Sequence, residues 1–263
     1  MTWLYMRLVS TTYTIPKRDG CSSENEDHFF PYEAEIRRDH HSVAIADGAS
    51  EGFLSRLWSK ILTISYVNWD AADVDMRLFI DFCIEMYEYQ SGRYLDQRVE
   101  EAAPLKWFEE NLKAKGSFST LLGLSFEDST PWGGCWTSYS VGDSCLFQLR
   151  QNIIDVFPEI DSTGFGNSPD LIASNPTYNK ELLNKVRVKS GEFLYGDIFY
   201  LMTDAVANWF IAQLEEGKRP WRTLDEYLDY DHEGLTIYLT SLRDEGRLKN
   251  DDVTIARIKT LEG

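Results

Sequence analysis

The sequence lacks the features that mark a secreted, membrane-spanning or zinc-binding protein. It has four cysteines, which form neither a Cys-x-x-Cys pair nor a metal-ligand spacing: Cys21, Cys83, Cys135 and Cys145. We therefore expect reduced thiols in a cytoplasmic protein. Arg7 interrupts the apolar residues at the start of the chain, which argues against a signal peptide. No run approaches the roughly 20 apolar residues of a membrane span.

Positive charge is also scarce. The chain has 26 Lys and Arg against 43 Asp and Glu, a net charge of −17. Such a surface repels phosphate backbones and anionic lipid, so we expect neither nucleic acid nor a membrane as a partner. The same excess leaves spare carboxylates for cations. Hydrophobic residues make up 43% of the chain, enough for a large core. Without an internal repeat or a composition break, residues 1–263 are predicted to form a single domain.

One stretch combines a buried strand with a functional side chain. Residues 43–46 are small or apolar, which predicts a buried strand, and the strand ends on Asp47. Gly48 is expected to let the backbone turn sharply there. An amphipathic helix is predicted over 50–69. A single Asp-Gly is also the ordinary composition of a turn, so the interpretation depends on whether other carboxylates repeat the pattern.

Other acidic residues do occupy similar positions. The apolar strand predicted over 198–202 is followed by Asp204. Asp251 and Asp252 directly precede the terminal strand. Glu26 and Asp27 stand before an aromatic strand. If these strands are neighbours in one sandwich, their ends converge, and the repulsion between carboxylates favours a bound cation. Ligands that are all oxygen suit Mg²⁺ or Mn²⁺ better than Zn²⁺.

Six motifs in order resemble those of the protein phosphatase 2C family, the metal-dependent Ser/Thr phosphatases. They are Asn25-Glu26-Asp27, Ala46-Asp47-Gly48, Gly116 to Leu121, Val141-Gly142-Asp143-Ser144, Gly196-Asp197 with Leu201 to Asp204, and Asn250 to Thr254. The resemblance covers nearly the whole chain. It implies an α+β fold in which a central antiparallel β-sandwich is flanked by helices on both faces, in four layers α-β-β-α. The loop over 158–180 would be a flap that shapes substrate access.

The resemblance also implies a centre of two Mn²⁺ or Mg²⁺ ions. Asp47 would bridge the ions, and Asp204 and Asp251 would both bind one of them, so these three are the catalytic candidates. The Gly48 carbonyl and waters held by Glu26 or Asp27 would complete the other coordination sphere. Asp143 would either stand beside the ligands or bind a third, weaker ion. Asp252 occupies the position where many relatives carry Asn, so we rank it behind Asp251.

The implied activity is hydrolysis of phosphoserine or phosphothreonine on a protein by a metal-activated water. The protein would be a partner of a Ser/Thr kinase. Three positions depart from the family pattern. Ser22 stands where bacterial-type relatives have a phosphate-holding Arg, and Ala49 and Ala205 replace a His and a Gly. We expect Arg18 to replace part of the lost arginine. The alternatives are a catalytically weak binding or regulatory module that keeps the metal, and an acidic domain with a purely structural role.

Overall fold

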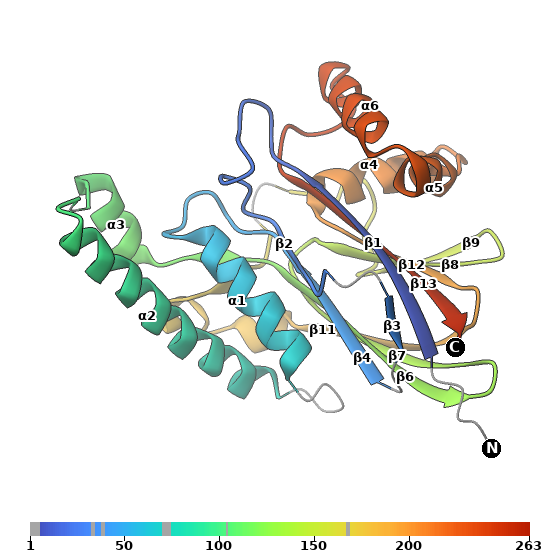
Figure 1. Ribbon diagram of the computed structural model, residues 1–263, viewed down its shortest axis with the longest axis horizontal. Helices are drawn as coiled ribbons and strands as arrows, with labels where there is room; N and C mark the ends of the chain where they lie inside the picture. Colours follow the sequence, from blue (N-terminus) through green and yellow to red (C-terminus); the bar gives the residue numbers. More distant parts are fainter. Residues whose placement is uncertain (1–5, 33–34, 38–39, 70–74, 104, 167–168) are drawn as a thin grey trace.

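Two antiparallel sheets form the centre of the computed structural model, which describes residues 6–32, 35–37, 40–69, 75–103, 105–166 and 169–263 (Figure 1). One sheet contains β1 (Met6–Ile15), β3 (Glu35–Arg37), β8 (Cys145–Arg150), β9 (Ile153–Phe157), β12 (Ile198–Met202) and β13 (Val253–Glu262). The other contains β2 (His28–Phe30), β4 (His40–Ala46), β6 (Leu121–Thr130), β7 (Gly133–Val141) and β11 (Arg187–Leu194). Their strand orders are β3-β1-β13-β12-β8-β9 and β11-β7-β6-β4-β2. A short third sheet pairs β5 (Phe118–Ser119) with β10 (Ile172–Ala173).

Helices cover the outer face of each large sheet. On the five-stranded side α1 (Ser55–Asn68) packs on β4 and α2 (Met76–Glu100) packs on α1, followed by α3 (Trp107–Lys115). On the six-stranded side lie α4 (Asp204–Glu215), α5 (Pro220–Tyr230) and α6 (His232–Asp244), as Figure 1 shows. No helix in the described part of the chain is long and apolar enough to cross a membrane.

Three apolar cores hold these layers together. Between the sheets, the rings of Phe126 and Phe199 meet edge to face with centroids 5.0 Å apart. The buried Trp58 belongs to the core between α1, α2 and the five-stranded sheet. On the opposite side, the rings of Phe147 and Phe210 lie 4.6 Å apart between β8 and α4. The predicted α+β four-layer sandwich is confirmed, because each sheet buries both of its faces.

Two predicted helices differ in extent from those observed. The helix expected over 50–69 begins only at Ser55, because residues 50–54 form turns. The helical region expected over 223–246 is two helices that meet at Asp231. The Asp231 side chain accepts a hydrogen bond from the Gly234 amide (2.7 Å), which caps α6 and starts a new helix direction. The loop over 158–180 contains β10 and a short 3₁₀ turn (Pro176–Tyr178), and its residues 167–168 lie outside the described chain.

Substitution of Gly123 in β6 tests the packing of α1 on its sheet. The Tyr66 ring lies directly over Gly123, and an added Cβ would come within 2.2 Å of Tyr66 Cζ. Gly123→Ala should therefore lower the free energy of unfolding by about 1–3 kcal/mol through overpacking. Gly92→Ala is the matched control, because an added Cβ there would meet nothing within 4 Å beyond the adjacent backbone of its own helix, and a helical alanine gains about 0.5–1 kcal/mol. Urea unfolding measures both, and equal effects would contradict the packing argument.

Candidate metal centre

The ends of strands from both sheets meet around one cavity. Its volume is about 520 Å³, and its lining includes Asp47, Gly48, Asp143, Asp204 and Asp251. Asp47 follows β4, Asp143 lies in the turn between β7 and β8, Asp204 begins α4 after β12, and Asp251 precedes β13. Residues that lie about 50 to 200 positions apart in the sequence therefore share one site because the sandwich aligns the ends of their strands.

Part of the predicted flap also lines this cavity. Gly166, Pro169 and Leu171 contribute to its wall. The loop is attached to α1 through Ile172, whose carbonyl oxygen accepts a hydrogen bond from the Trp58 indole (2.8 Å). The position of these residues agrees with a loop that shapes access, which stays a prediction.

The backbone around Asp47 is fixed by neighbouring strands. The Asp47 amide donates to Thr120 Oγ1 (3.0 Å), and the Thr120 amide donates to the Asp47 carbonyl oxygen (2.9 Å). Gly48 does not adopt a left-handed conformation, in contrast to the sharp turn expected from the sequence. It is required by close approach instead, since an added Cβ would lie 2.9 Å from the Glu26 carbonyl oxygen and 3.0 Å from that of Ser55.

Mutual repulsion dominates the electrostatics of the site. Burial raises the pKa of Asp47 well above its usual range, and the charges of Asp27, Asp204, Asp251 and Asp143 raise it further. Burial and the neighbouring Asp204 raise the pKa of Asp143 to about 6. The structure therefore brings five of the predicted carboxylates close enough to repel one another.

The two acids of the first motif face different surroundings. Asp27 is buried, and the Thr203 hydroxyl donates to its Oδ2 (2.9 Å). Burial, Asp252 and Asp204 raise the pKa of Asp27 well above its usual range, which places it at the centre. Glu26 instead lines an adjacent cavity of about 510 Å³, where Lys17 Nζ lies 3.5 Å from its Oε2. Of the two alternatives left open by the sequence, Asp27 is the one beside Asp47.

Asp251 and Asp252 also lie in different surroundings. Asp251 lines the central cavity, whereas Asp252 is buried and accepts hydrogen bonds from the backbone amides of Lys17 and Glu26, both at 2.8 Å. Asp252 thus joins the last motif to the loop that carries the first. Its two oxygens are engaged by the protein, which agrees with its lower rank as a ligand.

Sequence reasoning missed a cation at this site. Lys249 Nζ lies 2.8 Å from Asp204 Oδ2 and 2.8 Å from Asp251 Oδ2. Although burial opposes it, the hydrogen bonds to these two carboxylates raise the pKa of Lys249 above its ordinary value. The signal in the sequence was a lysine two residues before Asp251, in a short connection between α6 and β13.

The donor set fits a hard divalent ion. Within the described residues, the buried atoms Asp27 Oδ1 and Asp143 Oδ1 accept no hydrogen bond. A buried carboxylate oxygen without a partner is costly, and a cation would remove that cost. As the side chains stand, no three His, Cys, Asp or Glu residues of the described chain are arranged to hold a metal ion. Asp204 and Asp251 instead form ion pairs with the Lys249 ammonium, and Asp27 accepts a hydrogen bond from Thr203.

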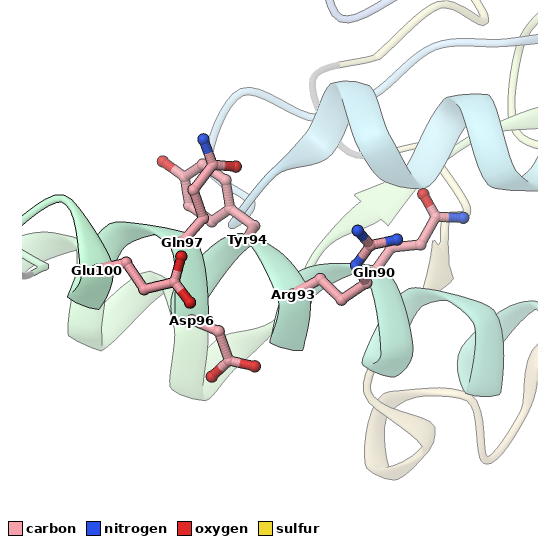
Figure 2. Close-up of a pocket in the computed structure, with 6 residues that line it drawn as sticks. All are labelled: Gln90, Arg93, Tyr94, Asp96, Gln97 and Glu100. Carbon is pink, nitrogen blue, oxygen red and sulfur yellow. The ribbon is translucent and has the colours of Figure 1, made fainter.

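Another cavity, of about 560 Å³, has no comparable chemistry. Figure 2 shows its lining side chains, which all project from α2: Gln90, Arg93, Tyr94, Asp96, Gln97 and Glu100. None of them is buried, and they come from successive turns of a single helix. Groups from several elements do not converge there, so the candidate site is the carboxylate cavity.

The architecture matches solved phosphatase structures along almost its whole length. The catalytic domain of the serine threonine protein phosphatase PstP, in complex with two manganese ions, has a TM-score of 0.55 and 14% identity, with 98% of this chain and 100% of that chain covered. The chain has the fold of the PP2C protein phosphatases. The phosphatase domain of SpoIIE from Bacillus subtilis gives a TM-score of 0.52 and 13% identity, covering 99% and 95%. RsbX in complex with magnesium gives 0.52 and 16%, covering 97% and 96%. The sequence matches no protein-family model and no curated protein.

The structure shows the surroundings of Ser22, where the family pattern has an arginine, and of Arg18, the expected replacement. Ser22 is exposed, and Arg56 Nη1 donates to its carbonyl oxygen (3.1 Å). The Arg18 guanidinium pairs with Asp244 of α6, and Arg18 lines the cavity of Glu26 rather than that of Asp47. Arg18 would have to leave this ion pair to reach a phosphate, so its role stays a prediction.

Asp47→Asn tests the repulsion directly. A carboxyl whose pKa is raised by folding stabilises the protein below the unfolded value, near pH 4, and this contribution is lost as the pH rises through the folded pKa. In chelator, Asp47→Asn should therefore have a higher Tm than wild type at pH 8, and the difference should shrink toward pH 4. Thermal unfolding at both pH values measures this. A variant less stable than wild type at pH 8 would contradict it.

Proposed function

We propose that this protein is a phosphatase that uses Mn²⁺ or Mg²⁺ to hydrolyse phosphoserine or phosphothreonine on proteins. The observation that carries the proposal is the convergence of five repelling carboxylates, two of which keep a buried oxygen without a hydrogen-bond partner in the described chain. Oxygen-only donors favour these two ions. The PP2C fold, shared with a phosphatase structure that holds two manganese ions, supports the same chemistry.

In this proposal Asp47, Asp204 and Asp251 would hold the ions. The Gly48 carbonyl and a water bound to Asp27 would supply further ligands. Asp143 would either support these groups or hold a third, weaker ion. When bound, the ions would activate a water and neutralise phosphate charge.

A phosphorylated segment of a protein would enter the cavity beside the 158–180 loop and the turn after β4, which both contribute to its lining. A metal-activated water would be the nucleophile, so the chain would need no activated side chain. The buried Cys145 is poorly suited to that role, because burial and nearby carboxylates raise the pKa of its thiol. We expect a phosphoprotein produced by a Ser/Thr kinase as the substrate.

A second candidate function is a binding or regulatory module with the same fold and little activity. Two observations favour it. The Lys249 ammonium lies between two of the proposed ligands, and Ser22 replaces the arginine that the resemblance predicts for phosphate binding. A bidentate guanidinium holds phosphate more strongly than a hydroxyl does.

Hydrolysis of a phosphothreonine peptide separates the two candidates. The proposed phosphatase should release phosphate only after Mn²⁺ or Mg²⁺ is added, and a chelator should stop the reaction, because oxygen ligands bind these ions reversibly. The measurement is phosphate release against metal concentration. Turnover that persists at full rate in chelator would exclude the metal mechanism, and metal binding without turnover would favour the binding module.

A pair of variants provides the internal control. Asp251→Asn should lower kcat by roughly a hundred-fold or more, since it removes a charged ligand from the site of phosphate transfer. Asp252→Asn should keep most of the activity at saturating Mn²⁺. It should instead lose about 1–3 kcal/mol of stability, because an amide can accept only one of the two backbone hydrogen bonds. The opposite order of activities would assign the ligand to Asp252.

A further inference from the structure

Lys249 forms a bridge between two separate elements of the candidate centre. Its ammonium lies 2.8 Å from a carboxylate oxygen of Asp204, at the start of α4, and 2.8 Å from one of Asp251, just before β13. These are the distances of charge-assisted hydrogen bonds. The side chain is 49% exposed, so water can reach the ammonium from the cavity.

The chain around Lys249 is built to hold this bridge. The Asp251 amide donates to the Lys249 carbonyl oxygen (3.0 Å), which folds the segment into a tight turn. Arg243 Nη2 donates to the Asp251 carbonyl oxygen (2.6 Å) and fixes the turn to α6. The neighbouring Leu248 is buried in the core under α4 and α6. The backbone at Lys249 is therefore held in place, and the ammonium of its side chain reaches the two carboxylates.

The other lysine of the cavity has a different partner. Among the described residues that line the cavity, the cationic side chains are Lys115 and Lys249. Lys115 Nζ lies 3.3 Å from Glu51 Oε2 and 5.4 Å from the centroid of the Phe118 ring. Lys249 alone of the two is bonded to the acids that repel Asp47.

We propose that Lys249 is an internal counter-ion, which holds Asp204 and Asp251 together without metal and must be displaced when a divalent ion binds. Lys249 thereby sets the affinity of the centre for its metal. The inference rests on the proposed metal centre, because the two carboxylates that bind the ammonium are also the proposed ligands of the ion.

Competition follows from charge and space. An ammonium and a divalent cation repel each other, so an ion held by Asp204 and Asp251 would drive the Lys249 ammonium away from them. Displacement breaks two ion pairs, which lowers the apparent affinity for metal. The partial exposure of Lys249 limits this effect, because solvent screens ion pairs at the surface. About a tenfold weakening is the expected size, the factor that corresponds to about 1.4 kcal/mol.

Lys249→Met tests the proposal, because it keeps an unbranched side chain and removes the charge. Calorimetric titration with Mn²⁺ should give a Kd about tenfold lower than that of wild type. In chelator the variant should unfold at a lower temperature, since Asp204 and Asp251 then repel each other without a counter-ion. Both readouts are independent of catalytic activity.

Lys115→Met is the matched control, a lysine of the same cavity that pairs with Glu51 instead. Its Kd for Mn²⁺ should stay close to that of wild type. If Lys249→Met binds Mn²⁺ no more tightly than wild type, or is equally stable in chelator, the role of Lys249 is overturned while the metal centre stands. If neither wild type nor Lys249→Met binds Mn²⁺, the proposed function and this inference both fail.

Discussion

Repulsion among carboxylates at one end of the sandwich is the constraint on which the site depends. Burial and neighbouring charges disfavour ionisation of Asp27, Asp47 and Asp143, and the charges of Asp204 and Asp251 add to the repulsion on Asp47. Such a cluster persists only because rigid elements hold it. The buried Phe126 and Phe199 are part of the apolar core that fixes the strands whose ends carry these acids. The stability of the sandwich therefore offsets the cost of the site.

The protein relieves only part of this repulsion with its own groups. Lys249 neutralises charge on Asp204 and Asp251, and the Thr203 hydroxyl satisfies one oxygen of Asp27. One oxygen each of Asp27 and Asp143 stays buried without a hydrogen-bond partner in the described chain, and the proposed function assigns these oxygens to a further cation. If the proposed function holds, Lys249 would weaken the capture of metal. Ser22, where the resemblance predicts an arginine, would weaken the capture of phosphate.

In two pairs of adjacent acidic residues, the two side chains have different partners. Neighbouring side chains leave the backbone in different directions, so one residue of a pair can face the cavity while the other faces away. Asp27 lies beside Asp47, while Glu26 turns to the cavity that holds Lys17. Asp252 uses both oxygens to bind the loop of the first motif, whereas Asp251 reaches the centre. The two ends of the sequence are thereby joined beside the site.

The sequence by itself determined the charge, the apolar strands and the acids at their ends, because period and composition are local properties. The four-layer fold was predicted from the family resemblance of the six motifs, and the acids at the strand ends predicted the group around Asp47. Only the tertiary structure decided that Gly48 serves close approach, that Asp27 rather than Glu26 joins the centre, and that Lys249 lies between two acids. Each of these depends on distances between segments far apart in the chain. Such distances arise from the packing of the two sheets, which local patterns do not encode.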